Sequence, residues 1–72
     1  MKKVKKIKIK INGEKIIIKD KEILSKILKN YKIPIKKVAI ELNREIINKE
    51  KIDKIKVKEN DIIEIVHFIG GG

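Results

Sequence analysis

The chain has 72 residues, enough for one domain around one hydrophobic core. It contains no cysteine, which excludes disulfides, thiolate nucleophiles and sulfur-ligated metal sites. The formal net charge is +10, with 20 Lys and Arg residues against 10 Asp and Glu residues. No apolar run exceeds three residues, so no segment is predicted to cross a membrane or to act as a signal peptide. We therefore expect a cytoplasmic protein.

The positive charge is spread over the whole chain. Nucleic-acid-binding domains concentrate arginine and lysine in a patch and add aromatic side chains that stack on bases. Here Arg44 is the one arginine, lysine occurs in every segment, and Tyr31 and Phe68 are the aromatic residues. We expect weak, salt-sensitive adhesion to polyanions and no specific binding of nucleic acid.

The N-terminal third is predicted to form a β-hairpin. Within residues 4–11, Ile7, Ile9 and Ile11 alternate with lysines, with the period of a half-buried strand. Asn12-Gly13 is a dipeptide favoured in two-residue type I′ turns, and residues 14–19 return as the partner strand.

The next predicted element is a helix of about ten residues, because apolar residues recur at the spacing of one helix face. Asp20 is expected to be the N-cap, with Glu22 in the first turn, where the helix dipole favours negative charge. Pro34 is expected to end the helix. The apolar stripe consists of Ile23, Leu24, Ile27, Leu28 and Tyr31.

Short strands and turns are predicted for the second half. The order of hairpin, helix and further strands indicates the α+β class: a β-grasp (ubiquitin-like) fold with a mixed sheet of four to five strands and one main helix. We expect residues 1–69 to form the domain and 70–72 a flexible tail. The predicted segments are strands over 38–42, 45–47 and 62–68, a turn at 43–44, a helical turn over 48–53 capped by Asn48, an edge segment over 54–57 and a turn over 59–61.

Gly70, Gly71 and Gly72 follow directly upon the last predicted strand. Without side chains they form a thin tail that can enter a narrow channel in another protein. The reactive group at its tip is the carboxylate of Gly72, which must first be converted by ATP into a mixed anhydride, the adenylate, before it reacts. The chain has no phosphate-binding loop, so a partner must supply this activation. The adenylate can then be attacked by a persulfide, giving a thiocarboxylate, or by an amine, giving an isopeptide.

The last predicted strand is apolar on both faces. Because one helix covers only one face of a sheet, Ile63 and Ile65 are assigned to the core, and Val66 and Phe68 to an exposed docking patch beside the tail. His67, the one histidine, is a poor metal ligand by itself, and no metal site is predicted. The carboxylates are scattered, so we expect solvated single charges without an acid–base pair.

Several segments resemble the sulfur carrier family of thiamine biosynthesis, ThiS. Residues 38–47, VAIELNREII, are similar to the family's V-A-V-E-L-N-G-E-I-V segment. Residues 61–72, DIIEIVHFIGGG, are similar to its D-x-I-E-I-V-H-F-V-G-G-G ending, and residues 9–14 to its I-x-L-N-G-E opening. Arg44 stands where many members have glycine, so this turn need not require a positive φ.

The resemblance implies a carrier that is a protein co-substrate and not an enzyme, with no cofactor of its own. A ThiF-like adenylyltransferase is expected to use ATP to adenylate Gly72, and a sulfur donor to convert the adenylate into a thiocarboxylate. A ThiG-like thiazole synthase is then expected to accept the sulfur, and the free carrier to be a monomer. Alternatives are a carrier like the small subunit of molybdopterin synthase, a ubiquitin-like protein modifier and, in another class, a basic nucleic-acid-binding module.

Overall fold

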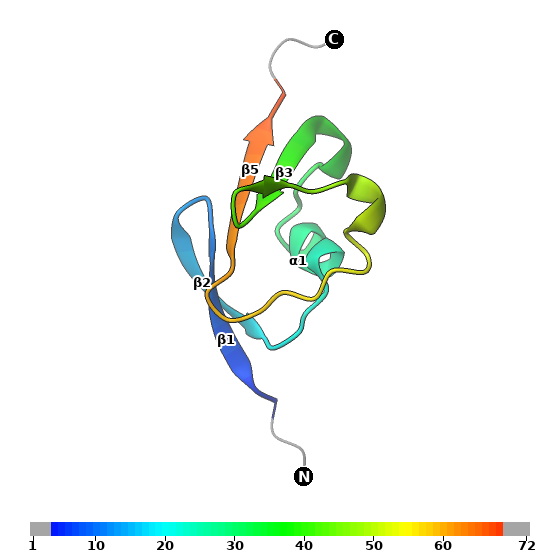
Figure 1. Ribbon diagram of the computed structural model, residues 1–72. Helices are drawn as coiled ribbons and strands as arrows, with labels where there is room; N and C mark the ends of the chain where they lie inside the picture. The colour runs from blue at the N-terminus through cyan, green and yellow to red at the C-terminus, as the bar shows by residue number, and fades with distance from the viewer. Residues whose placement is uncertain (1–3, 69–72) are drawn as a thin grey trace.

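A computed structural model describes residues 4–68, which form one five-stranded sheet with a single α-helix across one face (Figure 1). The strand order is β2-β1-β5-β3-β4, and the sheet is mixed because β1 and β5 run parallel while the other neighbours are antiparallel. The predicted mixed sheet with one main helix is therefore confirmed. The strands are β1 (Lys6–Ile11), β2 (Glu14–Lys19), β3 (Val38–Leu42), β4 (Glu45–Ile46) and β5 (Ile62–His67); the helix is α1 (Leu24–Asn30), and η1 (Ile35–Lys37) and η2 (Lys49–Lys51) are short 3₁₀ helices.

The N-terminal hairpin has the predicted register. β1 and β2 pair from Lys6↔Lys19 to Ile11↔Glu14. Asn12 and Gly13 join them with φ values of 49° and 82°, both positive as a type I′ turn requires. The isoleucines of β1 point into the core and its lysines point to solvent, as the period-2 alternation predicts.

The core lies between the sheet and α1. The helix contributes Leu24, Ile27 and Leu28, all almost completely buried. The segment between η2 and β5 adds Ile52 and Val57 to the same buried cluster. The other buried apolar residues are Ile7, Ile9, Ile11, Val38, Ile40, Ile63 and Ile65.

The helix begins later than predicted. Asp20 is not its N-cap and Glu22 is not in its first turn: α1 starts at Leu24, and its N-cap residue, Ile23, makes no side-chain capping bond. The N–H groups of Leu24 and Ser25 donate instead to the carbonyls of Ile55 and Ile52, at 2.9 and 3.1 Å. Backbone acceptors from a distant segment thus replace a local cap, which removes the need for an acidic side chain.

The other boundaries shift by a few residues. The helix ends at Asn30, before Pro34, which precedes η1. Asn48 caps η2 as predicted, accepting a hydrogen bond from the N–H of Glu50 at 2.9 Å. Residues 54–57 form no strand, only an isolated bridge between Lys56 and Ile23. Within residues 4–68, no helix is long and apolar enough to cross a membrane.

The turn between β3 and β4 corrects one expectation. Asn43 and Arg44 have φ values of 52° and 70°, so this turn does need the left-handed conformation at both positions. The reason is its length: Leu42 pairs with Glu45, and only two residues connect the antiparallel strands. A two-residue link of this kind favours a type I′ turn, whichever residue occupies its second position.

Replacing Arg44 by glycine is expected to stabilise the domain. A non-glycine residue in the left-handed region costs about 1–2 kcal/mol, which glycine avoids. The greater entropy of glycine in the unfolded chain offsets roughly 0.5–1 kcal/mol of this benefit. We expect Arg44→Gly to raise the free energy of unfolding by about 0.5–1 kcal/mol in urea denaturation. Arg44→Ala keeps the strain and is the matched control. If Arg44→Gly is no more stable than Arg44→Ala, the positive φ at position 44 does not strain the backbone.

Candidate functional site

The strand that leads to the terminal glycines, β5, is the central strand of the sheet. It pairs in parallel with β1 on one side and antiparallel with β3 on the other. Its last residue, His67, still pairs with Val38, and the N–H of Phe68 donates to the carbonyl of Lys37 at 3.0 Å. The chain is therefore held by backbone hydrogen bonds up to Phe68, at one end of the sheet (Figure 1).

Two turn asparagines fix β5 from both sides. The Oδ1 atom of Asn12 accepts a hydrogen bond from the N–H of Ile65 at 2.7 Å, just beyond the point where the pairing with β1 ends at Ile11↔Ile63. The Oδ1 atom of Asn43 accepts one from the N–H of Ile62 at 2.9 Å. Both side chains thus extend the hydrogen bonding of β5, whereas the sequence indicated only turn-forming roles for them.

Asp61, immediately before β5, is a buried carboxylate that sequence reasoning missed. Its side chain accepts hydrogen bonds from the amide of Asn43 at 3.0 Å and from the N–H of Lys58 at 2.8 Å. The expectation that all carboxylates are solvated single charges is therefore wrong for Asp61. Asp and Asn are common turn residues, and nothing local to 59–61 indicates a partner 18 residues away.

Truncating Asn43 should be strongly destabilising. Asn43→Ala removes two side-chain hydrogen bonds and leaves the buried Asp61 carboxylate without one of its donors. Each net hydrogen bond contributes about 0.5–1.5 kcal/mol, more when charged, so we expect a loss of about 2–3 kcal/mol in urea denaturation. Asn43→Gly separates the contributions, because it relaxes the positive φ and loses the same bonds. A loss below about 0.5 kcal/mol for Asn43→Ala contradicts the role of Asn43 in fixing β5.

The two faces of β5 differ as predicted. Ile63 and Ile65 are buried, with exposed fractions of 0% and 7%, and belong to the core. Ile62, Glu64 and Val66 point to the opposite face of the sheet, which α1 does not cover. The assignment of the core face is therefore confirmed.

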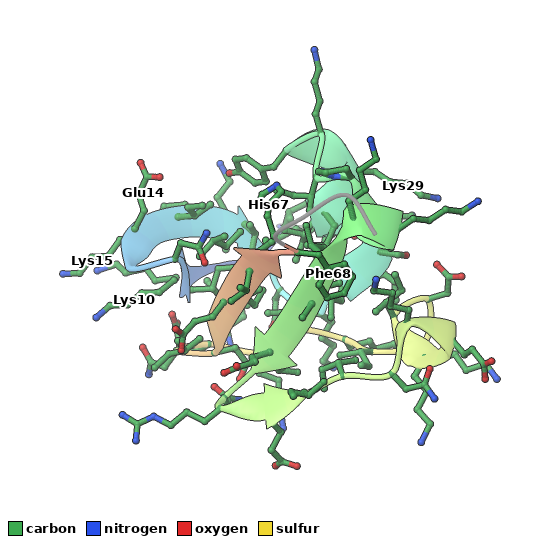
Figure 2. The ribbon with its side chains drawn as sticks, turned by 90° about the horizontal axis from the view of Figure 1, so that it is seen from above. Lys10, Glu14, Lys15, Lys29, His67 and Phe68 are labelled. Atoms are coloured by element: carbon green, nitrogen blue, oxygen red, sulfur yellow. The ribbon has the colours of Figure 1, made fainter. Side chains whose placement is uncertain are left out.

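Val66 and Phe68 are exposed apolar residues that come shortly before the terminal glycines in the chain. Their exposed fractions are 55% and 61%, high for side chains of this kind. The ammonium group of Lys49 lies 5.1 Å from the centroid of the Phe68 ring, a cation–π contact that fixes one side of the ring. Figure 2 shows Phe68 and His67 together at the end of β5. The exposure agrees with a docking patch, and the docking itself remains a prediction.

The remaining site residues divide into two groups. His67 is exposed, and residues 4–68 contain no group of three or more His, Asp or Glu side chains placed to hold a metal ion. Gly70, Gly71 and Gly72, the predicted tail and covalent site, lie outside the described residues. The structure therefore describes β5, which leads to the terminal glycines, and the exposed apolar residues at its end.

The sheet order, with the last strand at its centre and a single helix across one face, defines the β-grasp class of proteins. The crystal structure of the thiamine biosynthesis protein ThiS from Geobacter metallireducens has the same fold, with a TM-score of 0.76 and 28% sequence identity. The similarity covers 92% of this chain and 100% of that one. The model of the ThiS family matches residues 3–72, and the chain therefore belongs to the ThiS family.

Curated relatives fall into two groups. The chain is 38% identical over 65 residues to the sulfur carrier protein ThiS of Bacillus subtilis, covering 89% of this chain and 98% of that protein. It is also 35% and 36% identical, each over 66 residues, to thiazole synthases of Magnetococcus marinus and Paramagnetospirillum magneticum. Those matches cover 92% of this chain, which spans only 20% of each thiazole synthase.

Proposed function

We propose that this chain is the sulfur carrier of a thiamine biosynthesis pathway and that Gly72 is its working group. The observation that carries the proposal is the family match, which extends over residues 3–72 and so includes the terminal glycines. The match and the 38% identity to a curated sulfur carrier bear out the predicted role as a protein co-substrate rather than an enzyme. The strand β5, fixed on both sides, supplies a rigid base for the tail.

The first partner in this proposal is a ThiF-like adenylyltransferase. A carboxylate oxygen of Gly72 attacks the α-phosphorus of ATP, and pyrophosphate leaves. A persulfide sulfur from a donor then attacks the acyl carbon and displaces AMP, and reduction of the S–S bond by a thiol leaves the thiocarboxylate. ATP and the sulfur donor belong to the partners, because the chain has no phosphate-binding loop of its own. We place the free carrier in the cytoplasm as a monomer.

The second partner is a ThiG-like thiazole synthase. Support comes from the two thiazole synthases in which a segment similar to this chain makes up a fifth of the protein. Linking a carrier to its acceptor in one chain raises their effective concentration, which is useful when the two must meet at every cycle. Val66 and Phe68 form the docking patch for these partners, because they are the exposed apolar residues nearest the tail on β5 and just beyond it.

The test is sulfur loading followed by intact mass measurement. After incubation with a ThiF-like enzyme, ATP, a persulfide donor and a thiol, the carrier should gain the mass difference between sulfur and oxygen. Adding a ThiG-like enzyme with its other substrates should return the carrier to its starting mass. A carrier that never gains this mass overturns the proposal, and linkage of the carrier to protein lysines identifies a modifier instead.

A further inference from the structure

The strand β2 lies at an open edge of the sheet. In the strand order β2-β1-β5-β3-β4 it has a neighbour on one side only. It is six residues long, whereas β4 at the other edge has two residues. An edge strand of this length can pair with a further strand along its free side. Its central segment, Ile16-Ile17-Ile18, is apolar throughout.

The register shows which backbone groups of β2 are free. Ile11 and Glu14 flank the two-residue turn and form a hydrogen-bonded pair, and such pairs alternate with non-hydrogen-bonded pairs along an antiparallel ladder. The N–H and C=O groups of Lys15 and Ile17 are therefore directed away from β1, and they form no hydrogen bond within residues 4–68. The free edge ends at Lys19, whose carbonyl accepts a hydrogen bond at 3.2 Å from the loop before α1.

A groove lies between β2 and α1, on the helix side of this edge. It has a volume of about 390 Å³, and its apolar lining comes from Ile18, Ile27 and Tyr31. Ile18 faces this side because its partner on β1, Ile7, is buried, and Tyr31 is 48% exposed at the end of the helix. Alternate side chains of a strand added to β2 would lie on the groove side, where apolar residues fit best. The other lining residues are Ile17, Lys19, Glu22 and Asn30.

The other side of the same edge is basic. Lys15, Ile17 and Lys19 alternate with the residues that face the helix, so they lie on the face that α1 does not cover. Lys15 lies directly opposite Lys10 and has no carboxylate partner within residues 4–68, while Lys19 lies 3.9 Å from Glu22. Carboxylates on an added strand would pair with Lys15 and Lys19, and an apolar residue between them would cover Ile17, which is 55% exposed.

A second copy of this chain fits the edge poorly. If two β2 strands paired antiparallel with their isoleucines facing one another, Lys15 of each copy would face Lys19 of the other. Each copy also carries a net charge of +10, which opposes association. Lysines on an edge strand commonly prevent self-pairing in this way. The same lysines favour a strand that carries carboxylates at the matching positions.

We propose that the β2 edge and the groove beside α1 bind an extended segment of a partner protein in which two acidic residues flank three apolar ones. The segment adds a strand to the sheet. Its acidic residues lie opposite Lys15 and Lys19, its central residue lies opposite Ile17, and its other two apolar residues lie opposite Ile16 and Ile18, on the groove side. The pattern is symmetric and fits in either chain direction. The inference does not rest on the proposed function, and β1 separates this edge from β5.

The test is a titration of the purified carrier with the end-blocked peptide Glu-Ile-Val-Ile-Glu at about 50 mM salt. The control peptide Ile-Glu-Val-Glu-Ile has the same composition and charge, but its acidic residues are placed differently along the strand. We expect the first peptide to bind at least about fivefold more tightly, because only its pattern matches both faces of the edge. Equal binding of the two peptides is non-specific attraction to a basic protein and overturns the inference.

Charge reversal on the carrier tests the lysines. Lys15→Glu/Lys19→Glu should weaken binding of Glu-Ile-Val-Ile-Glu at least about tenfold and should strengthen binding of Lys-Ile-Val-Ile-Lys. The matched control, Lys51→Glu/Lys54→Glu, makes the same change in net charge at exposed residues in and after η2, which lies across the molecule from β2 (Figure 1). It should weaken binding of the acidic peptide less than about threefold. Equal losses in the two variants, or none, overturn the inference.

The backbone pairing has its own test. Ile17→Pro removes an N–H that β1 does not use, so it should abolish peptide binding while the domain stays folded by thermal melting. Ile17→Val keeps this N–H and should bind within about threefold of wild type. If Ile17→Pro does not fold, N-methylated peptides decide: methylation of the central residue or of its two neighbours should abolish binding in one case only. Equal effects of the two methylations overturn the inference, as does dimerisation of the carrier through this edge.

Discussion

Deleting Gly72 is expected to abolish sulfur loading completely while leaving the domain folded. The deletion still leaves a glycine carboxylate at the end of the chain, so the chemistry of the terminal group is unchanged. What changes is its reach, because one extended residue spans about 3.3–3.6 Å. A reacting carboxylate must approach ATP within about 3–3.5 Å in the correct alignment, and a shortfall of a full residue prevents this. Contacts that the carrier makes with the enzyme elsewhere cannot compensate for the missing residue.

Intact mass after the loading reaction measures this effect, with thermal melting as the check on folding. In the part of the chain that the structure describes, the buried apolar core lies between Ile7 and Ile65, so we expect the melting temperature not to change. The matched control deletes Lys2 at the other end of the chain and should load like wild type. If the chain without Gly72 still gains sulfur, the carboxylate of Gly72 is not the carrier group.

The strands were predictable because their signals are local and periodic. Ile7, Ile9 and Ile11 alternate with lysine, and Asn12-Gly13 fixes the turn, so the hairpin follows from fourteen residues of sequence, 6–19. The faces of β5 were predictable because a single helix covers only one face of the sheet. Ile63 and Ile65 lie on the covered face, and Val66 lies on the other. The family resemblance rested on the same segments, and the family match confirms it.

The errors came from contacts between segments far apart in the sequence. Asp20 and Glu22 are residue types that favour a helix N-terminus. In the structure, however, the first N–H groups of α1 donate to the carbonyls of Ile52 and Ile55. Asn43 is predicted only as a turn residue, but its amide donates a hydrogen bond to Asp61, 18 residues away in the sequence. Arg44 in place of glycine suggested a turn that need not require a positive φ, and the two-residue link between β3 and β4 imposes one. Local propensity does not contain this information.

Truncating Phe68 should weaken partner binding without unfolding the domain, and truncating Ile65 should do the reverse. Phe68 is 61% exposed and its ring contacts the ammonium group of Lys49, so Phe68→Ala should cost less than about 1 kcal/mol of stability, the size of an exposed cation–π contact. As an interface anchor it should contribute about 2 kcal/mol or more to binding, a loss of roughly thirtyfold in affinity. Ile65 is 7% exposed within the core, and Ile65→Ala should cost about 2–5 kcal/mol of stability by leaving a cavity.

Urea denaturation and titration against a ThiF-like enzyme distinguish the two variants. Ile65 and Phe68 lie three residues apart, so a difference between them reflects the face each occupies and not the distance from the tail. The affinity of Ile65→Ala for the enzyme should be measured at a temperature where the variant is still folded. Under that condition we expect the affinity to equal that of wild type. Unfolding of Phe68→Ala as severe as that of Ile65→Ala means that the ring supports the core through Lys49 and its neighbours. Wild-type affinity in a folded Phe68→Ala variant means that the enzyme binds the carrier without contacting this ring, and it overturns Phe68 as part of the docking patch.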